Sequence, residues 1–510
     1  MKKKTLIVGT LILTSASLIT RLLGFAFRVY MSNVMGAEGM GLYQLLFPIY
    51  MLLWAASSAG ISLAISKLVA EYTSKEQHSN ALRVLKVALS IGIPFSSLLS
   101  LLLFSFAPFI ATYFIHEPIT TLSVRILASC IPFMCTACCI RGYFQGRQEM
   151  SISAIAQIGE QVMRMLIIYL FAGLFIPKGL EYACALGVLG MCAGEAFSFV
   201  MTIIFFKVKK QKLHLRPPSV AYHTTFNQLM VLTIPITANR FLTSILQSLE
   251  NILIPIQLQK FGLSSSTALG LYGEFSGMAL PLLFFPSMVT MSLSTVLVPT
   301  ISEAVAMRNH YLLQRTLSKA IQFSAFIGVG ATALFLSLSK QIALSCYGLE
   351  EVGDLLKLLA IICPFLYLQN ILTGAMNGLG MQKQTFKTNI IGSLICISTI
   401  LLVVPKKGII GFVLAMLLQS GLVTTLLLSH VLKNIALPID LYNWILKPVV
   451  SGAICSLLTI SLYNGYLCHH FSLRLGTFMA IILLGTSYLI SLFALKCVTI
   501  KDIQLVIGSK

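Results

Sequence analysis

Two cationic side chains share one face of an apolar segment near the start of this chain. In residues 6–31, Arg21 and Arg28 follow Thr14 and Ser17 at steps of three, four and seven residues. This spacing places all four on one side of a helix. Because an arginine at the centre of a membrane span costs about 2.5–3.5 kcal/mol, we expect this face to line a water-filled cavity. For Arg28, near the predicted outer end, an interfacial position is the alternative.

A second polar face is predicted in residues 228–258. Arg240, Gln247 and Asn251 recur there at helical spacing, and Glu250 lies beside them. Guanidinium groups bind phosphate oxygens through two parallel hydrogen bonds. Together the two faces predict a substrate-binding cavity for a doubly charged head group, such as that of a lipid diphosphate whose tail stays in the bilayer.

Acidic residues within the apolar segments are candidates for ion coupling or for ion pairing. Glu160 and Arg164 are four residues apart with the acid first, which is the favourable order for a helical ion pair. A role at the substrate is the alternative for this pair. Glu250 and Glu274 are candidates to bind a coupling cation, Na⁺ or H⁺, or else to pair with Arg240.

Nothing in the sequence predicts a metal site, a resident cofactor or covalent catalysis. Cys135, Cys138 and Cys139 have a spacing seen in metal sites, but they lie among apolar residues without a nearby histidine or acid. We expect these thiols to pack between helices. The chain has no Walker A sequence and no nucleophile elbow, so ATP-driven movement by this chain is excluded and no enzyme activity is expected.

The elements that must position these residues are membrane spans. Of 510 residues, 57% are hydrophobic and 10% are charged, and the mean hydropathy is +0.89. A spanning helix needs about 20 mostly apolar residues. Fourteen such segments lie at 6–31, 40–66, 84–110, 121–144, 152–176, 182–206, 228–258, 269–297, 319–339, 355–378, 386–404, 408–431, 442–463 and 474–495. The predicted fold is all-α, with fourteen transmembrane helices.

The net charge of +20 reflects membrane topology rather than nucleic-acid binding. With the N-terminus placed in the cytoplasm, 24 of the 36 Lys and Arg residues fall at cytoplasmic ends, seven at outer ends and five within spans. The opposite orientation would contradict the positive-inside rule. The sequence therefore predicts a protein of the cytoplasmic membrane with both termini in the cytoplasm.

Two parts of the chain are related by an internal repeat. Residues from about 64 to 146 match residues from about 296 to 378 at a constant offset of 232, without gaps. Matching pairs include Arg83 and Arg315, Gly142 and Gly374, and Gly146 and Gly378. The repeated glycines are spaced for close helix packing. Paired membrane-embedded repeats are typical of secondary transporters, whose substrate site lies between the halves near the bilayer midplane.

The repeat predicts the domain organisation. We expect an N-lobe at 1–206, a basic cytoplasmic linker at 207–225, a C-lobe at 226–431, and two appended spans with a cytoplasmic tail at 432–510. The linker is the most basic stretch and is broken by two prolines, as is common at lobe boundaries. Six spans in each lobe is an even number, so both lobes enter the membrane in the same direction as a parallel repeat.

Short motifs resemble the multidrug/oligosaccharidyl-lipid/polysaccharide exporter superfamily and, within it, the stage V sporulation protein B family. These motifs are Thr20-Arg21-Leu22-Leu23-Gly24-Phe25, Met35-Gly36-Ala37-Glu38-Gly39-Met40-Gly41-Leu42-Tyr43, Gly60-Ile61-Ser62-Leu63-Ala64-Ile65-Ser66-Lys67 and Arg141-Gly142-Tyr143-Phe144-Gln145-Gly146. The resemblance covers nearly the whole chain, including the number of spans.

The resemblance implies a V-shaped, two-lobed transporter that works by alternating access. It implies a flippase for a polyprenyl-diphosphate-linked glycan, most closely the peptidoglycan precursor lipid II used for spore cortex. Lipid II flippases carry an Arg-x-Leu-Gly-Phe segment in the first helix, which Arg21 and Leu23-Gly24-Phe25 match. The last two spans would form a groove for the lipid tail. A peptidoglycan synthase is a candidate partner, besides membrane lipid.

Two other functions remain open. A cation-coupled drug antiporter of the same superfamily would favour carboxylates over arginines in its cavity. A membrane glycan polymerase or ligase would need reactive groups in an outer loop, where Glu350, Glu351 and Asp354 cluster. The outer loops are short, which favours a transporter over an enzyme.

Overall fold

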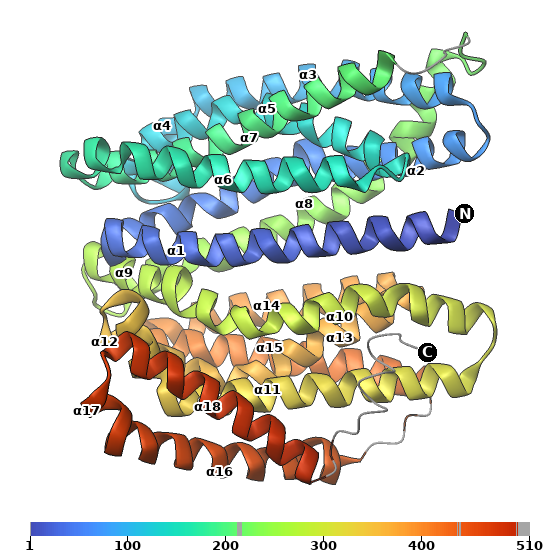
Figure 1. The fold of residues 1–510 in the computed structure, drawn as a ribbon. Helices are drawn as coiled ribbons and strands as arrows, with labels where there is room; N and C mark the ends of the chain where they lie inside the picture. Colours follow the sequence, from blue (N-terminus) through green and yellow to red (C-terminus); the bar gives the residue numbers. More distant parts are fainter. Residues whose placement is uncertain (1, 212–216, 436, 438–439, 496, 498–510) are drawn as a thin grey trace. The chain divides into compact units, whose positions relative to one another are not determined.

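Long helices make up almost all of the molecule (Figure 1). The computed structural model describes residues 2–211, 217–435, 437, 440–495 and 497, and these ranges contain helices and turns but no β-strand. Within them, thirteen stretches are long and apolar enough to cross a membrane. The prediction of an all-α, multi-pass membrane protein is therefore confirmed.

The helices have the following bounds. They are α1 (Lys2–Trp54), α2 (Gly60–Ser74), α3 (His78–Ser105), α4 (Ala107–Phe109), α5 (Thr121–Gly146), α6 (Met150–Phe175), α7 (Leu180–Gln211), α8 (Tyr222–Lys260), α9 (Ser265–Tyr272), α10 (Leu280–Ala306), α11 (His310–Tyr347), α12 (Glu350–Leu359), α13 (Cys363–Gly378), α14 (Gln382–Lys407), α15 (Ile409–Asn434), α16 (Lys447–Leu462), α17 (Cys468–His470) and α18 (Leu473–Ala494). Short π- and 3₁₀-helical segments join some of them, among them η1 (Ala55–Ala59) and η5 (Gly273–Ala279).

The first long element holds two predicted spans. The backbone of α1 leaves helical geometry at Gly36 (φ 70°, ψ −179°), a conformation that residues with a Cβ rarely adopt. Gly36 lies in a continuous apolar stretch of 60 residues, Ser15–Ser74. At 1.5 Å per residue this stretch would be about 90 Å long, roughly three times the thickness of the hydrocarbon core. It therefore contains two spans, and the predicted total of fourteen is confirmed.

The described residues form two compact units. Of the described residues, the first unit holds those up to Ile256 and Ser265–Gly273, and the second holds Gln257–Ser264 and those from Glu274 onward. Helices α1 to α7, most of α8 and α9 therefore pack in the first unit, and α10 to α18 pack in the second. Residues 212–216 of the predicted linker lie outside the described residues. The lobe boundary at 207–225 stays a prediction.

Backbone conformation repeats between the two units at the offset found in the sequence. Three turn residues of the first unit have left-handed φ angles, and so do the residues 232 positions later. The pairs are Glu76 (59°) and Arg308 (51°), His116 (62°) and Gly348 (72°), and Gln148 (63°) and Gly380 (77°). Because these angles are rare for residues other than glycine, their recurrence shows that the same turns connect the same helices in both copies.

Helix packing repeats in the same register. Ser62 Oγ donates to the carbonyl oxygen of Cys138 at 3.1 Å, and Ser294 Oγ donates to that of Asn370 at 2.7 Å. A Cβ added to Gly142 would lie 2.6 Å from the Ser62 carbonyl oxygen. The equivalent distance from Gly374 to the Ser294 carbonyl oxygen is 2.7 Å. The repeated glycines thus allow two helices to meet backbone to backbone, as their spacing predicts.

The two final spans pack within the second unit. Helices α16 and α18 contact each other and α11. The Tyr488 hydroxyl of α18 donates to the carbonyl oxygen of Phe326 in α11 at 3.1 Å. Gly330 gives the ring room, because a Cβ there would lie 2.8 Å from Tyr488. This pair is therefore part of a packed unit rather than a loose appendage.

The cysteines of α5 are buried in helix contacts. Cys135 Sγ lies 3.3 Å from the Ser57 carbonyl oxygen, and a Cβ on Gly92 of α3 would lie 3.1 Å from the same sulfur. Cys138 and Cys139 are also buried. These thiols fill space between helices, in agreement with the packing role predicted for them.

Candidate functional site

Four ionisable side chains from three helices meet inside the first unit. Glu160 and Arg164 lie one turn apart on α6, Arg141 comes from α5, and Glu195 comes from α7. A tyrosine of α1, Tyr50, completes the group. We refer to these five residues as the charged cluster.

The Glu160 carboxylate joins two guanidinium groups. Its Oε2 lies 3.3 Å from Arg141 Nη1, and its Oε1 lies 3.2 Å from Arg164 Nη2. All three side chains are only 15% exposed. Glu160 and Arg164, one helical turn apart, form an ion pair. This pair is one of the two alternatives given by the sequence, the other being a role at the substrate. Arg141 adds a second bond from a neighbouring helix, so the cluster ties α5 to α6.

Glu195 is held differently from Glu160. Its side chain is buried, and the Tyr50 hydroxyl donates to its Oε1 at 2.5 Å. Its Oε2 is also buried and has no hydrogen-bond partner among the described residues. A buried carboxylate oxygen without a partner carries a substantial desolvation cost when the group is charged. Glu195 is therefore the group of the cluster with capacity to take up a proton or a small cation.

The charge balance of the cluster supports the same chemistry. Two arginines face two glutamates, so the group is neutral when both acids are ionised. Taking up one cation at Glu195 would leave one net positive charge inside the unit. In a medium of low dielectric such a change has large electrostatic consequences for neighbouring groups. The arrangement can therefore sense the binding and release of a single cation.

The predicted cationic face of α1 lies in the same unit. Arg21 is exposed and Arg28 is half-buried, and both side chains have interactions with their surroundings. Gly24 lies between them on this face, and a Cβ there would be 3.7 Å from Gln161 Nε2 of α6. Because Gln161 follows Glu160 in sequence, the polar face of α1 approaches α6 near the charged cluster.

The second predicted polar face lies on α8. Arg240 and Gln247 are exposed, and Asn251 is half-buried and accepts a hydrogen bond from the Tyr272 hydroxyl at 3.4 Å. Ser248 Oγ donates to the Pro48 carbonyl oxygen at 3.2 Å, which places α8 against α1. The first unit therefore contains both cationic faces. Their contact with substrate stays a prediction.

The two remaining acids divide between the units. Glu250 is half-buried on α8 of the first unit and has an interaction partner. Glu274 is half-buried in η5, where the second unit resumes after Gly273. Their roles in ion coupling or pairing stay predictions.

Sequence reasoning missed three members of the charged cluster. The spacing of residues in the sequence does not single out Arg141, Glu195 or Tyr50 as site residues. The partners come from different helices, and Tyr50 and Glu195 are 145 residues apart. The available signal was the presence of an acid in the middle of an apolar span, because such a residue requires a partner.

Two protein-family models match this chain. The model described as "Polysaccharide biosynthesis protein" matches residues 6–305, and the model described as "MatE" matches residues 241–402. The first match covers more than half of the chain.

Curated relatives from Bacillus subtilis (strain 168) align over most of the sequence. Stage V sporulation protein B is 31% identical over 452 residues, covering 88% of this chain and 87% of the relative. Sporulation protein YkvU is 24% identical and covers 87% of this chain and 99% of the relative. Lipid II flippase MurJ is 24% identical over 76% of each chain.

Solved structures share the fold. A structure of lipid II flippase MurJ in an inward closed conformation has a TM-score of 0.71 at 16% identity, covering 94% of this chain and 98% of that chain. An inward-facing multidrug resistance MATE family transporter has a TM-score of 0.63 at 13% identity, covering 88% and 96%. The names of the flippase and of the MATE family protein describe transport, and these matches indicate a transporter rather than an enzyme. With its all-helical fold and these matches, the chain belongs to the polysaccharide biosynthesis protein family, and stage V sporulation protein B is a relative at 31% identity.

Proposed function

We propose that this protein is a flippase that moves a polyprenyl-diphosphate-linked glycan across the cytoplasmic membrane. The observation that carries the proposal is the 31% identity to stage V sporulation protein B over 88% of the chain, together with the alignment to lipid II flippase MurJ. Within this class we propose lipid II for spore cortex synthesis as the substrate. A peptidoglycan synthase that consumes the flipped lipid is the proposed partner.

The proposed head-group site is the cationic surface of α1 and α8. Arg21, Arg28 and Arg240 supply guanidinium groups that match the oxygens of a diphosphate. Gln247 and Asn251 on the same face of α8 can hydrogen-bond to sugar hydroxyls. The polyprenyl tail stays in the bilayer, in a groove that the resemblance assigns to the last two spans.

The proposed driving force is a cation gradient. Glu195 is the proposed coupling group, since it combines burial with a carboxylate oxygen that has no partner among the described residues. Binding of Na⁺ or H⁺ there changes the charge of the cluster that joins α5, α6 and α7. Glu250 and Glu274 are the second candidates. A transporter that alternates between inward and outward access needs such a bias to move lipid in one direction.

The proposed orientation follows from the positive-inside rule and puts both termini in the cytoplasm. Under this orientation the turns between α2 and α3 and between α10 and α11 lie on the cytoplasmic side. Insertion of a reporter at an exposed residue of each turn, such as Glu76 or Arg308, tests this placement by accessibility to a membrane-impermeant reagent. Labelling from the outside of intact cells would contradict it.

A drug/cation antiporter is the second candidate function. The MatE match over residues 241–402 and the MATE structures that share the fold favour it. Against it, the polar faces of α1 and α8 carry three arginines, and a cationic drug would be repelled there. Flippase and antiporter therefore differ in the sign of charge that their site accepts.

Transbilayer movement of fluorescent lipid II in proteoliposomes tests the proposed function. We expect transport by the wild type and loss of transport in Arg21→Ala and in Arg240→Ala. Arg125→Ala is the matched control, because Arg125 lies in a span outside the two faces and stacks over Phe104 at 5.6 Å. Absence of wild-type transport under an imposed cation gradient would reject the substrate. Equal transport by all three variants would reject the arginine site.

A further inference from the structure

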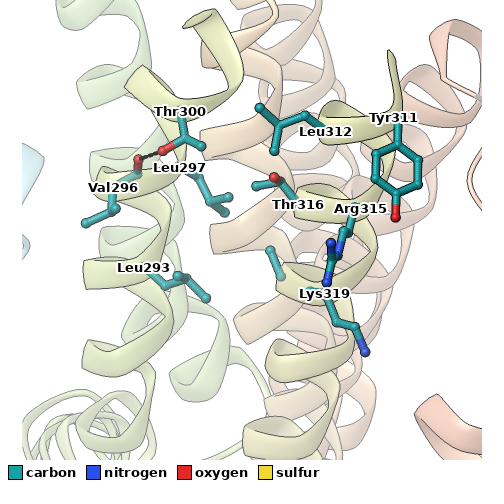
Figure 2. Close-up of a pocket in the computed structure, with 10 residues that line it drawn as sticks. Leu293, Val296, Leu297, Thr300, Tyr311, Leu312, Arg315, Thr316 and Lys319 are labelled. Atoms are coloured by element: carbon teal, nitrogen blue, oxygen red, sulfur yellow. Dashed lines mark hydrogen bonds between the residues drawn. The ribbon is translucent and has the colours of Figure 1, made fainter. Parts of the chain in front are cut away.

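A cavity lies between α10 and α11 in the second unit, apart from every residue assigned above. Its volume is about 180 Å³. Leu293, Leu297 and Leu312 form apolar walls, and Arg315 and Lys319 supply two cations along α11. Figure 2 shows Leu293 and Leu297 of α10 opposite Leu312 and Thr316 of α11, with Arg315 and Lys319 beside them on α11.

The internal repeat allows this cavity to be compared with the equivalent groove of the first copy. The equivalent groove in the first unit lies between α2 and α3, and the chain itself fills it. Asn80 Nδ2 donates to Ser219 Oγ at 2.8 Å, and its Oδ1 accepts from the Val220 amide at 3.2 Å. The Arg83 guanidinium donates to the Val220 carbonyl oxygen. Leu229 of α8 is buried in the same apolar cluster.

Two of the differences between the copies decide what this groove can hold. Arg83 corresponds to Arg315, so one guanidinium is kept in both copies. Asn80 corresponds to Leu312, which cannot make the two hydrogen bonds that hold the chain in the first unit. At the position of the buried Val87, the second copy has Lys319.

The second copy therefore has a groove with more positive charge and without the two hydrogen bonds that Asn80 makes in the first copy. Lys319 is oriented by Gln322, whose Oε1 accepts from its ammonium at 3.0 Å. The Arg315 guanidinium has five donors. The Lys319 ammonium, which also has contacts within the protein, adds a second positive charge beside it. The ligand that complements them carries anionic oxygens beside an apolar part.

The position of the cavity relative to the membrane indicates that such a ligand is a membrane phospholipid. It adjoins the turn that leads from α10 to α11, which the proposed orientation puts at the cytoplasmic surface. Val296 is 48% exposed, so the apolar wall opens toward the hydrocarbon. Tyr311 is 70% exposed at the same end, as is common for aromatic residues at the membrane interface. Anionic phospholipids are abundant in the cytoplasmic leaflet and attract basic residues there.

We propose that this cavity binds an anionic phospholipid of the cytoplasmic leaflet. The phosphate lies against Arg315 and Lys319, and the start of one acyl chain lies along Leu293 and Leu297. This lipid is a resident ligand and not the transported substrate, for which the cationic faces of α1 and α8 are proposed. Its binding is independent of transport and can be measured without it.

Native mass spectrometry of the purified full-length protein tests the proposal. The probes are phosphatidylglycerol and phosphatidylcholine with the same acyl chains, and glycerol 3-phosphate as a soluble phosphate. Interaction with an anionic lipid is worth about 1 kcal/mol per basic residue near the surface. We therefore expect the double variant Arg315→Gln/Lys319→Gln, which loses two such interactions, to bind phosphatidylglycerol about 30-fold more weakly.

The matched control removes the same charge from the same predicted side of the same unit. Lys383→Gln with Lys387→Gln, two exposed residues of α14, should leave binding unchanged. A second variant, Thr316→Phe, fills the cavity and keeps both cations. It should also reduce binding, and a thermal melt checks that each variant is folded.

Four results would overturn the proposal. The first is equal retention of phosphatidylglycerol and phosphatidylcholine by the wild type, and the second is binding of phosphatidylglycerol to the double variant at wild-type strength. The third is displacement of the bound lipid by glycerol 3-phosphate at matched concentration. The fourth is a gain of lipid binding after removal of residues 498–510. The last result would assign the cavity to the chain's own end, because the Cys497 carbonyl oxygen accepts from Gln322 Nε2 at 3.1 Å next to Lys319.

Discussion

Replacement of Glu195 by glutamine should separate lipid movement from its driving force. The amide is nearly the same size as the carboxylate, and its oxygen can still accept the Tyr50 hydroxyl at the position of Oε1. The substitution removes the negative charge and puts an amide where the buried Oε2 has no partner among the described residues. The helices should therefore keep their packing, while cation binding at this position is lost.

The size of the effect follows from the number of charges. One carboxylate takes up one monovalent cation in each cycle. A tenfold gradient of that cation then supplies about 1.4 kcal/mol, which corresponds to a tenfold ratio of lipid between the leaflets at steady state. The wild type should approach this ratio, and Glu195→Gln should give a ratio near one at any gradient.

Proteoliposomes with fluorescent lipid II and an imposed Na⁺ or H⁺ gradient give the measurement, with a membrane-impermeant quencher reporting the leaflet ratio. Glu181→Gln is the control, since Glu181 lies in the first turn of the same helix and outside the cluster. Retention of the wild-type ratio by Glu195→Gln would refute the assignment of this residue to coupling. Loss of all lipid movement in a folded variant would also contradict it, because the residue would then act on the substrate step.

Three further variants test the packing and electrostatics that hold the fold. Glu160→Ala leaves two buried guanidinium groups without their carboxylate and should lower the free energy of unfolding by about 3–5 kcal/mol, measured by thermal or denaturant unfolding in detergent. Gly142→Ala places a methyl group against a backbone oxygen and should cost about 1–3 kcal/mol, whereas Gly173→Ala, with open space around it, should not destabilise. Asp440 has a pKa below its ordinary value because Asn443 donates to its carboxylate from its side chain and its backbone amide. Its contribution to the start of the next helix is present at neutral pH and is lost as the pH falls below about 4, which amide exchange against pH measures; Asp440→Asn should remove this dependence.

The sequence predicted those features that repeat or that depend on local chemistry. The offset of 232 residues located the glycine contacts at Gly142 and Gly374, and the structure adds that the turns at His116 and Gly348 recur with the same left-handed backbone. Span number followed from segment length alone, since the hydrocarbon thickness sets how many apolar residues a helix needs. These properties depend on residues that are close in sequence or related by a constant shift.

The charged cluster depends on contacts that neither the repeat offset nor the length of the apolar segments predicts. Glu195 shows no partner at helical spacing on α7, and its hydrogen bond comes from Tyr50 on α1. Arg141 lies near the end of α5, where a basic residue also fits an interfacial position. Only the packing of α5, α6 and α7 against one another brings these groups within bonding distance. The cost of burying a charge can indicate that a partner exists, but it cannot identify the partner.

The internal repeat also gives a test of what the cluster is for. At the offset of 232, Arg141, Glu160 and Arg164 correspond to Thr373, Gly392 and Cys396. The second copy thus builds the same helix packing without these charges, so the scaffold does not require them. Removing one member leaves an uncompensated charge, but replacing a whole buried ionic group by apolar residues is often neutral or stabilising.

We therefore expect a quadruple variant, with leucine at Arg141 and Arg164 and methionine at Glu160 and Glu195, to be at least as stable as the wild type. It should still insert and fold, and it should lose the response of lipid movement to a cation gradient. Thermal unfolding and the leaflet ratio in proteoliposomes measure the two properties on the same preparation. A quadruple variant that remains gradient-driven would mean that the cluster only packs helices, and that coupling resides at Glu250 or Glu274. A variant that is much less stable than Glu160→Ala would contradict the argument from the repeat.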